Sequence, residues 1–256
     1  MVDVAVGLAL GGMIPFANTF AVLFLRAAEQ IRTCVAYAKT NVKIVGSYSG
    51  LSNFKDGPTH HVECDIAVMR SMPNMTVVEA ADAVEARKIV PVIAEHEGPV
   101  YLRLSRSDVP VIFDESYEVK IGKGAILRDG SDVALIASGV MVSRCLEAAE
   151  KLAKEGIDAY VVNMSSIKPL DAELVWKMAR ETGAIVTAED HSIIGGLGGA
   201  VAEALGEKSP ANLERIGIPD TFTETALSYD ELLDHYGMSV DDIVRAAQRT
   251  IKRKSK

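Results

Sequence analysis

The amino-acid sequence predicts an α/β protein of two domains, each with a mostly parallel sheet flanked by helices. Short apolar runs bounded by turn residues are typical of buried parallel strands, and they recur at 42–46, 75–78, 100–104, 133–137, 159–162 and 184–187. Amphipathic stretches typical of helices alternate with these runs, at 80–96, 140–155, 172–182 and 197–205. This alternation indicates βαβ units with helices on both faces of a sheet.

The boundary between the domains is predicted from a break in this alternation. The chain has 256 residues, which is more than the ~100–200 residues of an ordinary domain. Proline, glycine and acidic residues cluster between Ser107 and Asp132. We therefore expect a first domain over residues 1–108, a connector over residues 109–124 and a second domain over residues 125–256.

An uncharged segment near the N-terminus has the length of a membrane span. It runs from Val4 to Leu25 and is interrupted by Gly11-Gly12, Pro15 and Asn18-Thr19, which are turn and cap residues of water-soluble structure. We predict a helix that ends at Gly11-Gly12, a strand over 14–17 and a second helix capped near Asn18 or Thr19. No membrane interaction is expected.

Charge and cysteine content limit the function classes. The chain has 27 Lys and Arg against 35 Asp and Glu, a net charge of −8, which gives it no general attraction to a nucleic acid. Its basic run, Lys252 to Lys256, is predicted to be a solvated tail. The three cysteines are far apart in the sequence, which favours reduced thiols, a cytoplasmic location and neither a disulfide nor a zinc site.

The densest polar cluster is the run from Asp56 to His61, which follows a predicted strand and a Ser/Gly-rich loop. Ligand sites of α/β proteins lie at the carboxyl ends of such strands. We expect Thr59 and His60 to project from a helix start, with His60 suited to proton transfer; a structural turn with two surface histidines is the alternative. The helical spacing of His61 and Asp65 provides two possible metal ligands without a third, so no metal site is predicted.

Two other segments are candidates for anion binding. Gly195 to Gly199 precedes a helix and follows the predicted loop 189–191. The run matches no phosphate-loop pattern, so close packing of the helix on the sheet is the favoured role. Arg103 and Arg106 end a predicted strand, where an arginine is well placed to contact a phosphate or to form a surface ion pair.

Eight segments closely resemble transketolases and follow the family's order over nearly the whole chain. Those similar to the pyrimidine-binding domain are 19–22, 28–32, 42–46, 56–60 (Asp-Gly-Pro-Thr-His), 73–77 and 102–106 (Leu-Arg-Leu-Ser-Arg). Those similar to the C-terminal domain are 166–170 and 189–198. The chain resembles the C-terminal section of a split transketolase, whose N-terminal subunit carries the diphosphate-binding domain.

The resemblance implies thiamine diphosphate shared between two chains, with Mg²⁺ held mainly by the partner subunit. Thr19 and Phe20 match residues at the cofactor's aminopyrimidine, on which Phe20 would stack, and Phe24 lies one helical turn further on. The cofactor acts as the electron sink. A homodimer or a heterotetramer is the implied assembly.

The resemblance also implies roles in binding a sugar or sugar phosphate. His60 matches a histidine at the reactive centre, Asp56 an aspartate that reads a donor hydroxyl, and Arg106 an arginine that grips the substrate phosphate. The family reaction transfers a two-carbon ketol unit from a ketose to an aldose. Tyr48 stands where transketolases commonly have histidine, and Lys55 replaces a glutamate, so the substrates are expected to differ from the usual pentose phosphates.

One departure concerns the start of the sequence. In the family an activating glutamate, in an Ala-Glu-Gln-Asn-Met context, comes just before the segment equivalent to Met1–Val4, and Asp3 does not match it. We expect a pyrimidine-binding domain that lacks its opening strand and helix. Two alternatives to a transketolase subunit remain open: an enzyme like 1-deoxy-D-xylulose-5-phosphate synthase, and a non-catalytic assembly subunit.

Overall fold

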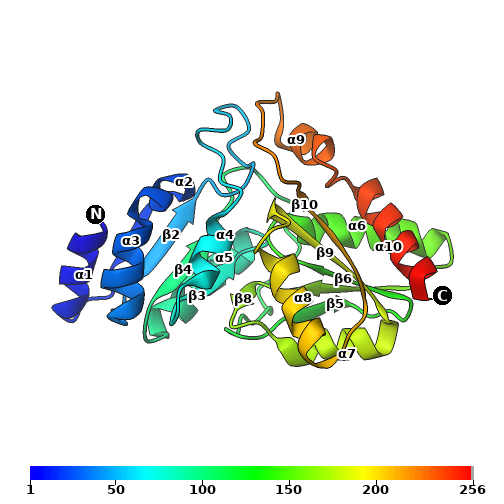
Figure 1. Cartoon of the computed structure of the whole chain (residues 1–256), viewed down its shortest axis with the longest axis horizontal. Coiled ribbons are helices and arrows are strands. Elements are labelled where there is room, and N and C mark those ends of the chain that lie inside the picture. The colour runs from blue at the N-terminus through cyan, green and yellow to red at the C-terminus, as the bar shows by residue number, and fades with distance from the viewer. Residues whose placement is uncertain (255–256) are drawn as a thin grey trace.

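A computed structural model describes residues 1–254 and contains two five-stranded sheets that lie side by side (Figure 1). The first sheet has the order β1 (Phe16–Phe20), β2 (Lys43–Ser47), β4 (Val100–Arg103), β3 (Thr76–Glu79) and β8 (Ser166–Lys168). Its first four strands are parallel, and β8 pairs antiparallel with β3.

Helices cover both faces of the first sheet because neighbouring strand residues point to opposite sides. Ile44 packs in one core cluster and Val45 in another, as do Val77 and Val78. On one face lie α1 (Val2–Leu10), α2 (Ala21–Phe24), a 3₁₀ turn (Leu25–Ala27), α3 (Ala28–Gln30), a π-helical segment (Ile31–Tyr37) and α4 (Asp65–Ser71). On the other lies α5 (Ala83–Glu95), which Asp82 caps by accepting a hydrogen bond from the Glu85 N–H.

The second sheet has the order β10 (Asn212–Ile218), β9 (Ala184–Ser192), β6 (Val133–Ala137), β7 (Ala159–Asn163) and β5 (Ala125–Arg128). The antiparallel strand β5 lies at one edge. Successive residues of β6 point alternately into two cores, one on each face of this sheet. One core packs against α6 (Met141–Lys154), α9 (Tyr229–His235) and α10 (Val240–Lys254), the other against α7 (Ala172–Thr182) and α8 (Leu197–Lys208).

The two halves are interwoven as well as adjacent. Residues 104–124 form neither helix nor strand and pass from one sheet to the other. Strand β8 comes from the second half of the sequence but extends the first sheet, next to β3. Within residues 1–254, no helix combines the length and apolarity that crossing a lipid bilayer requires.

The sequence-based boundaries were wrong at two strands. Strand β1 runs over Phe16–Phe20 instead of 14–17, because five consecutive residues pair with β2, and the next helix therefore begins at Ala21. Strand β9 continues through residues 189–191, which were expected to be a loop. These three polar residues are buried because loops and α4 of the first half pack over them. In the C-terminal basic run, residues 252–254 belong to α10, and residues 255–256 lie outside the described part.

Candidate active site

The predicted site residues converge at the carboxyl edge of the first sheet. Phe20 is the last residue of β1, Tyr48 follows β2, and Arg106 follows β4 after two residues. Residues 48–62, here called the 48–62 loop, carry Asp56 and His60 across the same edge (Figure 1). Parallel strands end at one edge of a sheet, and this places side chains from four separate segments close together.

Three aromatic rings and a guanidinium form a row across this edge. The Phe20 and Tyr48 rings are stacked, with centroids 4.0 Å apart and an interplanar angle of 18°. The His60 ring meets Phe20 edge-on at 6.2 Å. On the Tyr48 side, the Arg106 guanidinium carbon lies 5.2 Å from the ring centroid, within the range of a cation–π contact. The row therefore places a titratable imidazole at one end and a fixed cation at the other.

Asn53 continues the row to Asp56. Arg106 Nη1 donates to Asn53 Oδ1 at 2.8 Å, and Asn53 Nδ2 donates to Asp56 Oδ2 at 2.7 Å. Asn53 is fully buried, whereas Asp56 and Arg106 are exposed. The structure thus brings together five of the residues expected at the site: Phe20, Tyr48, Asp56, His60 and Arg106.

His60 lies in a tight turn instead of at the expected helix start. Its N–H donates to the Gly57 carbonyl at 2.9 Å, and α4 begins only at Asp65. Thr59 Oγ1 and His60 Nδ1 are 3.0 Å apart. Since Nε2 has no hydrogen-bond partner among the described residues, it is free to exchange a proton with a substrate.

His61 is structural. Its Nε2 lies 3.0 Å from the Asn53 carbonyl and donates to it, which leaves Nδ1 to accept from Thr223 Oγ1 at 2.7 Å. Burial lowers the pKa of His61, consistent with this neutral form. Asp65 accepts hydrogen bonds from Tyr101 and Arg103. The spacing of His61 and Asp65 thus serves internal bonds, and no cluster of three or more His, Cys, Asp or Glu suited to a metal ion occurs in residues 1–254.

Thr19 and Phe24 lie beside the row instead of within it. Both line a cavity of about 480 Å³ next to α1 and α2, and Phe24 is buried in the core. Gln30 lines the same cavity, and its buried Oε1 has no hydrogen-bond partner. An unpaired buried acceptor is costly unless a donor reaches it. The cavity wall therefore includes a residue with an unpaired hydrogen-bond acceptor.

Arg103 is not an anion-binding residue, contrary to one sequence-based expectation. It is fully buried and forms ion pairs with Asp65 and Glu79. Its Nη2 donates to the Asp190 carbonyl at 2.8 Å, and Glu79 in turn accepts from Ser138 Oγ at 2.6 Å. Arg103 therefore joins the two halves of the chain, and only Arg106 remains exposed at the site.

The glycine-rich segment before α8 is closed by the protein's own carboxylate. Glu189 accepts from the N–H groups of Leu197 and Gly198, at 2.6 and 2.8 Å. Burial raises the pKa of Glu189 to about 8. Because this side chain occupies the start of α8, the structure agrees with the packing role and leaves no open phosphate cradle.

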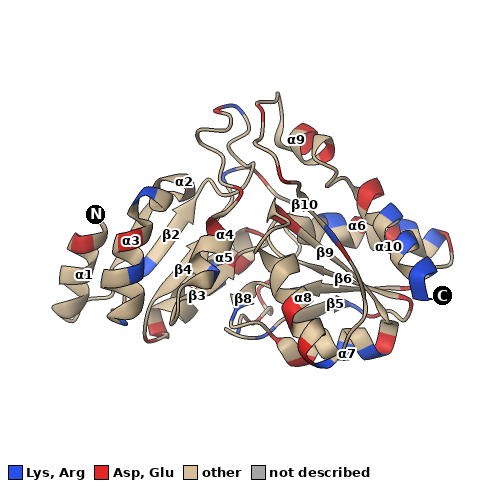
Figure 2. Cartoon of the chain, in the orientation of Figure 1, with Lys and Arg blue, Asp and Glu red and all other residues tan. Residues whose placement is uncertain are grey.

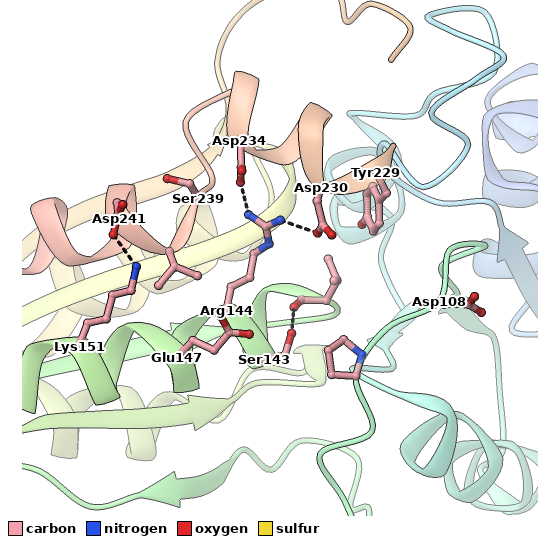
Figure 3. Close-up of a pocket in the computed structure, with 13 residues that line it drawn as sticks. Asp108, Ser143, Arg144, Glu147, Lys151, Tyr229, Asp230, Asp234, Ser239 and Asp241 are labelled. Carbon is pink, nitrogen blue, oxygen red and sulfur yellow. Dashed lines mark hydrogen bonds and ion pairs between the residues drawn. The ribbon is translucent and has the colours of Figure 1, made fainter. Parts of the chain in front are cut away.

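A cavity of about 460 Å³ lies elsewhere, between α6, α9 and the start of α10 (Figure 3). Its two cations are already neutralised, since Arg144 pairs with Asp230 and Asp234 and Lys151 pairs with Asp241. None of the residues of the row lines it. It offers no free cation to an anionic substrate.

Sequence reasoning missed three residues that shape the site: Gln30, Asn53 and Thr223. Asn53 stands three residues before Asp56, a spacing too common to single it out. Gln30 lay inside a segment of family resemblance without an assigned role, and Thr223 is distant in sequence. Only the folded chain brings Thr223 against His61.

Comparison with known proteins identifies the family. Residues 1–111 match the transketolase pyrimidine-binding domain, and residues 122–243 match the transketolase C-terminal domain. A 6-deoxy-6-sulfo-D-fructose transketolase subunit of Clostridium sp. (strain MSTE9) is 45% identical over 256 residues, covering 100% of this chain and 79% of the relative. An apulose-4-phosphate transketolase subunit of Phocaeicola vulgatus is 39% identical, covering 98% of this chain and 81% of the relative.

A solved structure agrees with these relatives over almost the whole fold. A split-gene transketolase described as an inactive β4 tetramer superposes with a TM-score of 0.92 at 46% identity, covering 98% of this chain and 80% of that one. The two halves of the present fold correspond to the two matched domains. The chain therefore belongs to the transketolase family and corresponds to the C-terminal section of a split transketolase.

Proposed function

We propose that this chain is one subunit of a thiamine diphosphate-dependent transketolase that moves a two-carbon ketol unit from a ketose to an aldose. The observation that carries the proposal is the row from His60 to Asp56 on an open edge of the first sheet. A second subunit would complete the site by binding the diphosphate and by providing most of the ligands of the Mg²⁺ ion.

The cavity beside the row fits the pyrimidine end of the cofactor. Phe20 offers a partly exposed ring next to Thr19, and the unpaired Gln30 Oε1 would accept a hydrogen bond from an amino group on the cofactor ring. When bound, thiamine diphosphate supplies the electron sink for breaking and forming the carbon–carbon bond. Phe24 would support Phe20 from the core.

Three polar residues would act on the substrate. His60, with Nε2 free, would transfer protons at the reacting oxygen, and Asp56 would accept from a sugar hydroxyl. Arg106 would grip a terminal anion with the N–H groups that Asn53 leaves free. The sulfonated and phosphorylated sugars in the names of two relatives support a substrate with a terminal anion.

An exposed apolar face supports the need for a partner. Charged side chains are sparse over α1 and α2 (Figure 2), and this face exposes Val4, Leu8, Leu10, Met13, Ile14, Phe16 and Leu23. Contiguous apolar surface of this kind marks a protein interface. We infer that the chain alone self-associates through this face and is inactive, as the similar β4 tetramer is described to be.

The test is a two-carbon transfer assay with thiamine diphosphate, Mg²⁺ and hydroxypyruvate as donor. The chain is assayed alone and mixed with a diphosphate-domain transketolase subunit. We expect transfer only in the mixture. A complex that forms but transfers no carbon would contradict the proposed function and favour an assembly subunit, and release of CO₂ from added pyruvate would favour the synthase.

A matched pair of histidine variants makes this test specific. His60→Ala should lower kcat in the mixture by roughly 10²–10⁴-fold, the usual contribution of a proton-transfer group. His235→Ala, at an exposed position on α9, should retain wild-type kcat. Equal activity of the two variants would remove His60 from the proposed mechanism.

A further inference from the structure

Asn53 holds two opposite charges that do not pair with each other. Its amide lies between the Arg106 guanidinium, at 2.8 Å, and the Asp56 carboxylate, at 2.7 Å. Neither charged group forms an ion pair within residues 1–254. Both are exposed, and the neutral amide between them adds no charge to either.

The orientation of this amide is determined by its partners. A guanidinium only donates hydrogen bonds and an ionised carboxylate only accepts them. The Asn53 oxygen must therefore face Arg106, and its nitrogen must face Asp56. Leucine or valine would make neither bond, and aspartate would neutralise Arg106 while facing Asp56 with a like charge.

The backbone around Asn53 is fixed as firmly as its side chain. Its carbonyl accepts from His61 Nε2 at 3.0 Å, and His61 is held in turn by Thr223 of the second half. Ser52 Oγ accepts from the Arg106 N–H at 3.1 Å. The amide thus stands at a rigid point from which it orients two solvent-facing side chains.

We propose that Asn53 is a positioning residue that keeps Arg106 and Asp56 apart as separately charged groups, so that the site favours sugars with both a hydroxyl and a terminal anion. The inference rests on the proposed transketolase function and extends it to substrate choice. Without the amide, Arg106 and Asp56 are free to turn toward each other and form an ion pair that competes with the substrate.

The kinetic test compares a ketose phosphate with the neutral ketose erythrulose as donors, in the mixture with the diphosphate-domain subunit. Asn53→Leu should raise KM for the ketose phosphate about 10- to 100-fold, as expected for hydrogen bonds to charged groups, and should change KM for erythrulose much less. Asn163→Leu is the matched control, since Asn163 is a buried asparagine whose partners, Glu85 and Tyr117, do not belong to the row. An equal loss with both donors would overturn the inference in favour of a purely structural role.

Two further variants separate positioning from folding. Asn53→Asp keeps the shape of the side chain and should also lose the preference for the phosphate donor, because it neutralises Arg106. In a double-mutant cycle, Arg106→Gln should abolish most of the additional effect of Asn53→Leu on that preference. Fully additive effects would contradict action through Arg106.

Crystal structures of the variants test the inference independently of the proposed function. They remain informative if the wild-type mixture transfers no carbon. In crystals of the Asn53→Leu chain, we expect Arg106 to leave its position over Tyr48 and to pair with Asp56. In crystals of the Asn53→Asp chain, we expect Arg106 to stay on residue 53 and Asp56 to turn away from the like charge introduced there. Unchanged positions of both charged side chains in both variants would overturn the inference.

Discussion

Tyr48 adopts a backbone conformation that few bulky residues tolerate. Its φ is +60°, in the left-handed region, where a non-glycine residue costs of order 1 kcal/mol or more. The strain directs its ring between Phe20 and Arg106. The sequence shows Tyr48 in place of the histidine common in transketolases. Only the fold shows that the Tyr48 ring contacts the Arg106 guanidinium.

Variants of Tyr48 should separate the ring from its hydroxyl. Tyr48→Phe keeps the stack and should change KM for a ketose phosphate less than twofold. Tyr48→Ala should raise it about two- to fivefold, because an exposed cation–π contact contributes about 0.5–1 kcal/mol. Steady-state kinetics of the two-subunit mixture checks this, and a larger loss in the phenylalanine variant would show that the hydroxyl matters instead.

The sequence predicted which residues lie together at the edge of the first sheet better than it predicted their surroundings. Phe20, His60, Asp56 and Arg106 each stand inside a short, distinctive segment, and for this reason motif resemblance singled them out as candidates. Arg103 was misread because it ends a strand, where an arginine is often exposed to a ligand, and the residues that bury it come from distant segments such as β9. Burial by long-range packing is invisible in a local pattern.

At the scale of elements, a side chain of β9 ties the start of the 48–62 loop to the second half of the chain. Asp190 accepts from the Leu51 N–H through both carboxylate oxygens, each at 3.1 Å, and from the Tyr229 hydroxyl at 2.6 Å. Gly50 packs so tightly there that an added Cβ would lie 2.0 Å from Asp190 Oδ2. The second half of the chain therefore sets the position of the loop that carries His60.

Gly50→Ala should displace this loop and lower kcat of the mixture at least tenfold, with some loss of stability. Gly156→Ala is the control, since Gly156 also has a positive φ, of +78°, but an added Cβ meets nothing within 4 Å. It should cost only the backbone strain of about 1–2 kcal/mol. Thermal unfolding and transfer assays of both variants give the comparison, and equal kcat values would show that the loop does not depend on this contact.

The sequence predicted the bounds of a strand well where the strand consists of buried apolar residues. Apolar runs gave β2, β6 and β7 nearly to the residue. Strand β9 was cut short because Glu189, Asp190 and His191 are polar, and β8 was not predicted because its three residues carry no periodic signal. Both errors arise at the contact between the two halves of the chain, where polar residues are buried because they form hydrogen bonds with each other.

At the scale of the whole molecule, His191 connects the two halves. Its Nδ1 donates to the Ser192 carbonyl at 2.7 Å, and its Nε2 accepts from the Ala67 N–H of α4 at 3.3 Å. Burial lowers the pKa of His191 to about 4. Protonation would place an N–H against the Ala67 N–H, so the contact requires the neutral ring.

This predicts an acid-sensitive contact between the halves. The pKa of His191 in the folded chain lies below the unfolded value of 6.5, so between these values the unfolded chain binds more protons. The contribution of His191 to stability should therefore fall as the pH falls from about 6.5 toward 4, while the raised pKa of the neighbouring Glu189 acts in the opposite direction. In urea titrations, His191→Gln should weaken this dependence and the exposed-site variant His235→Gln should not; identical slopes in all three proteins would contradict the assignment.

Strand β8 has a consequence for how the gene can be divided. The connector over 104–124 looks like a natural place to separate two domains, yet a break there would remove β8 from the first sheet and leave the edge of β3 open. Open strand edges recruit other chains. A first half produced without β8 would therefore present the open edge of β3 to other chains, and we expect the two halves to remain soluble only when they are kept together.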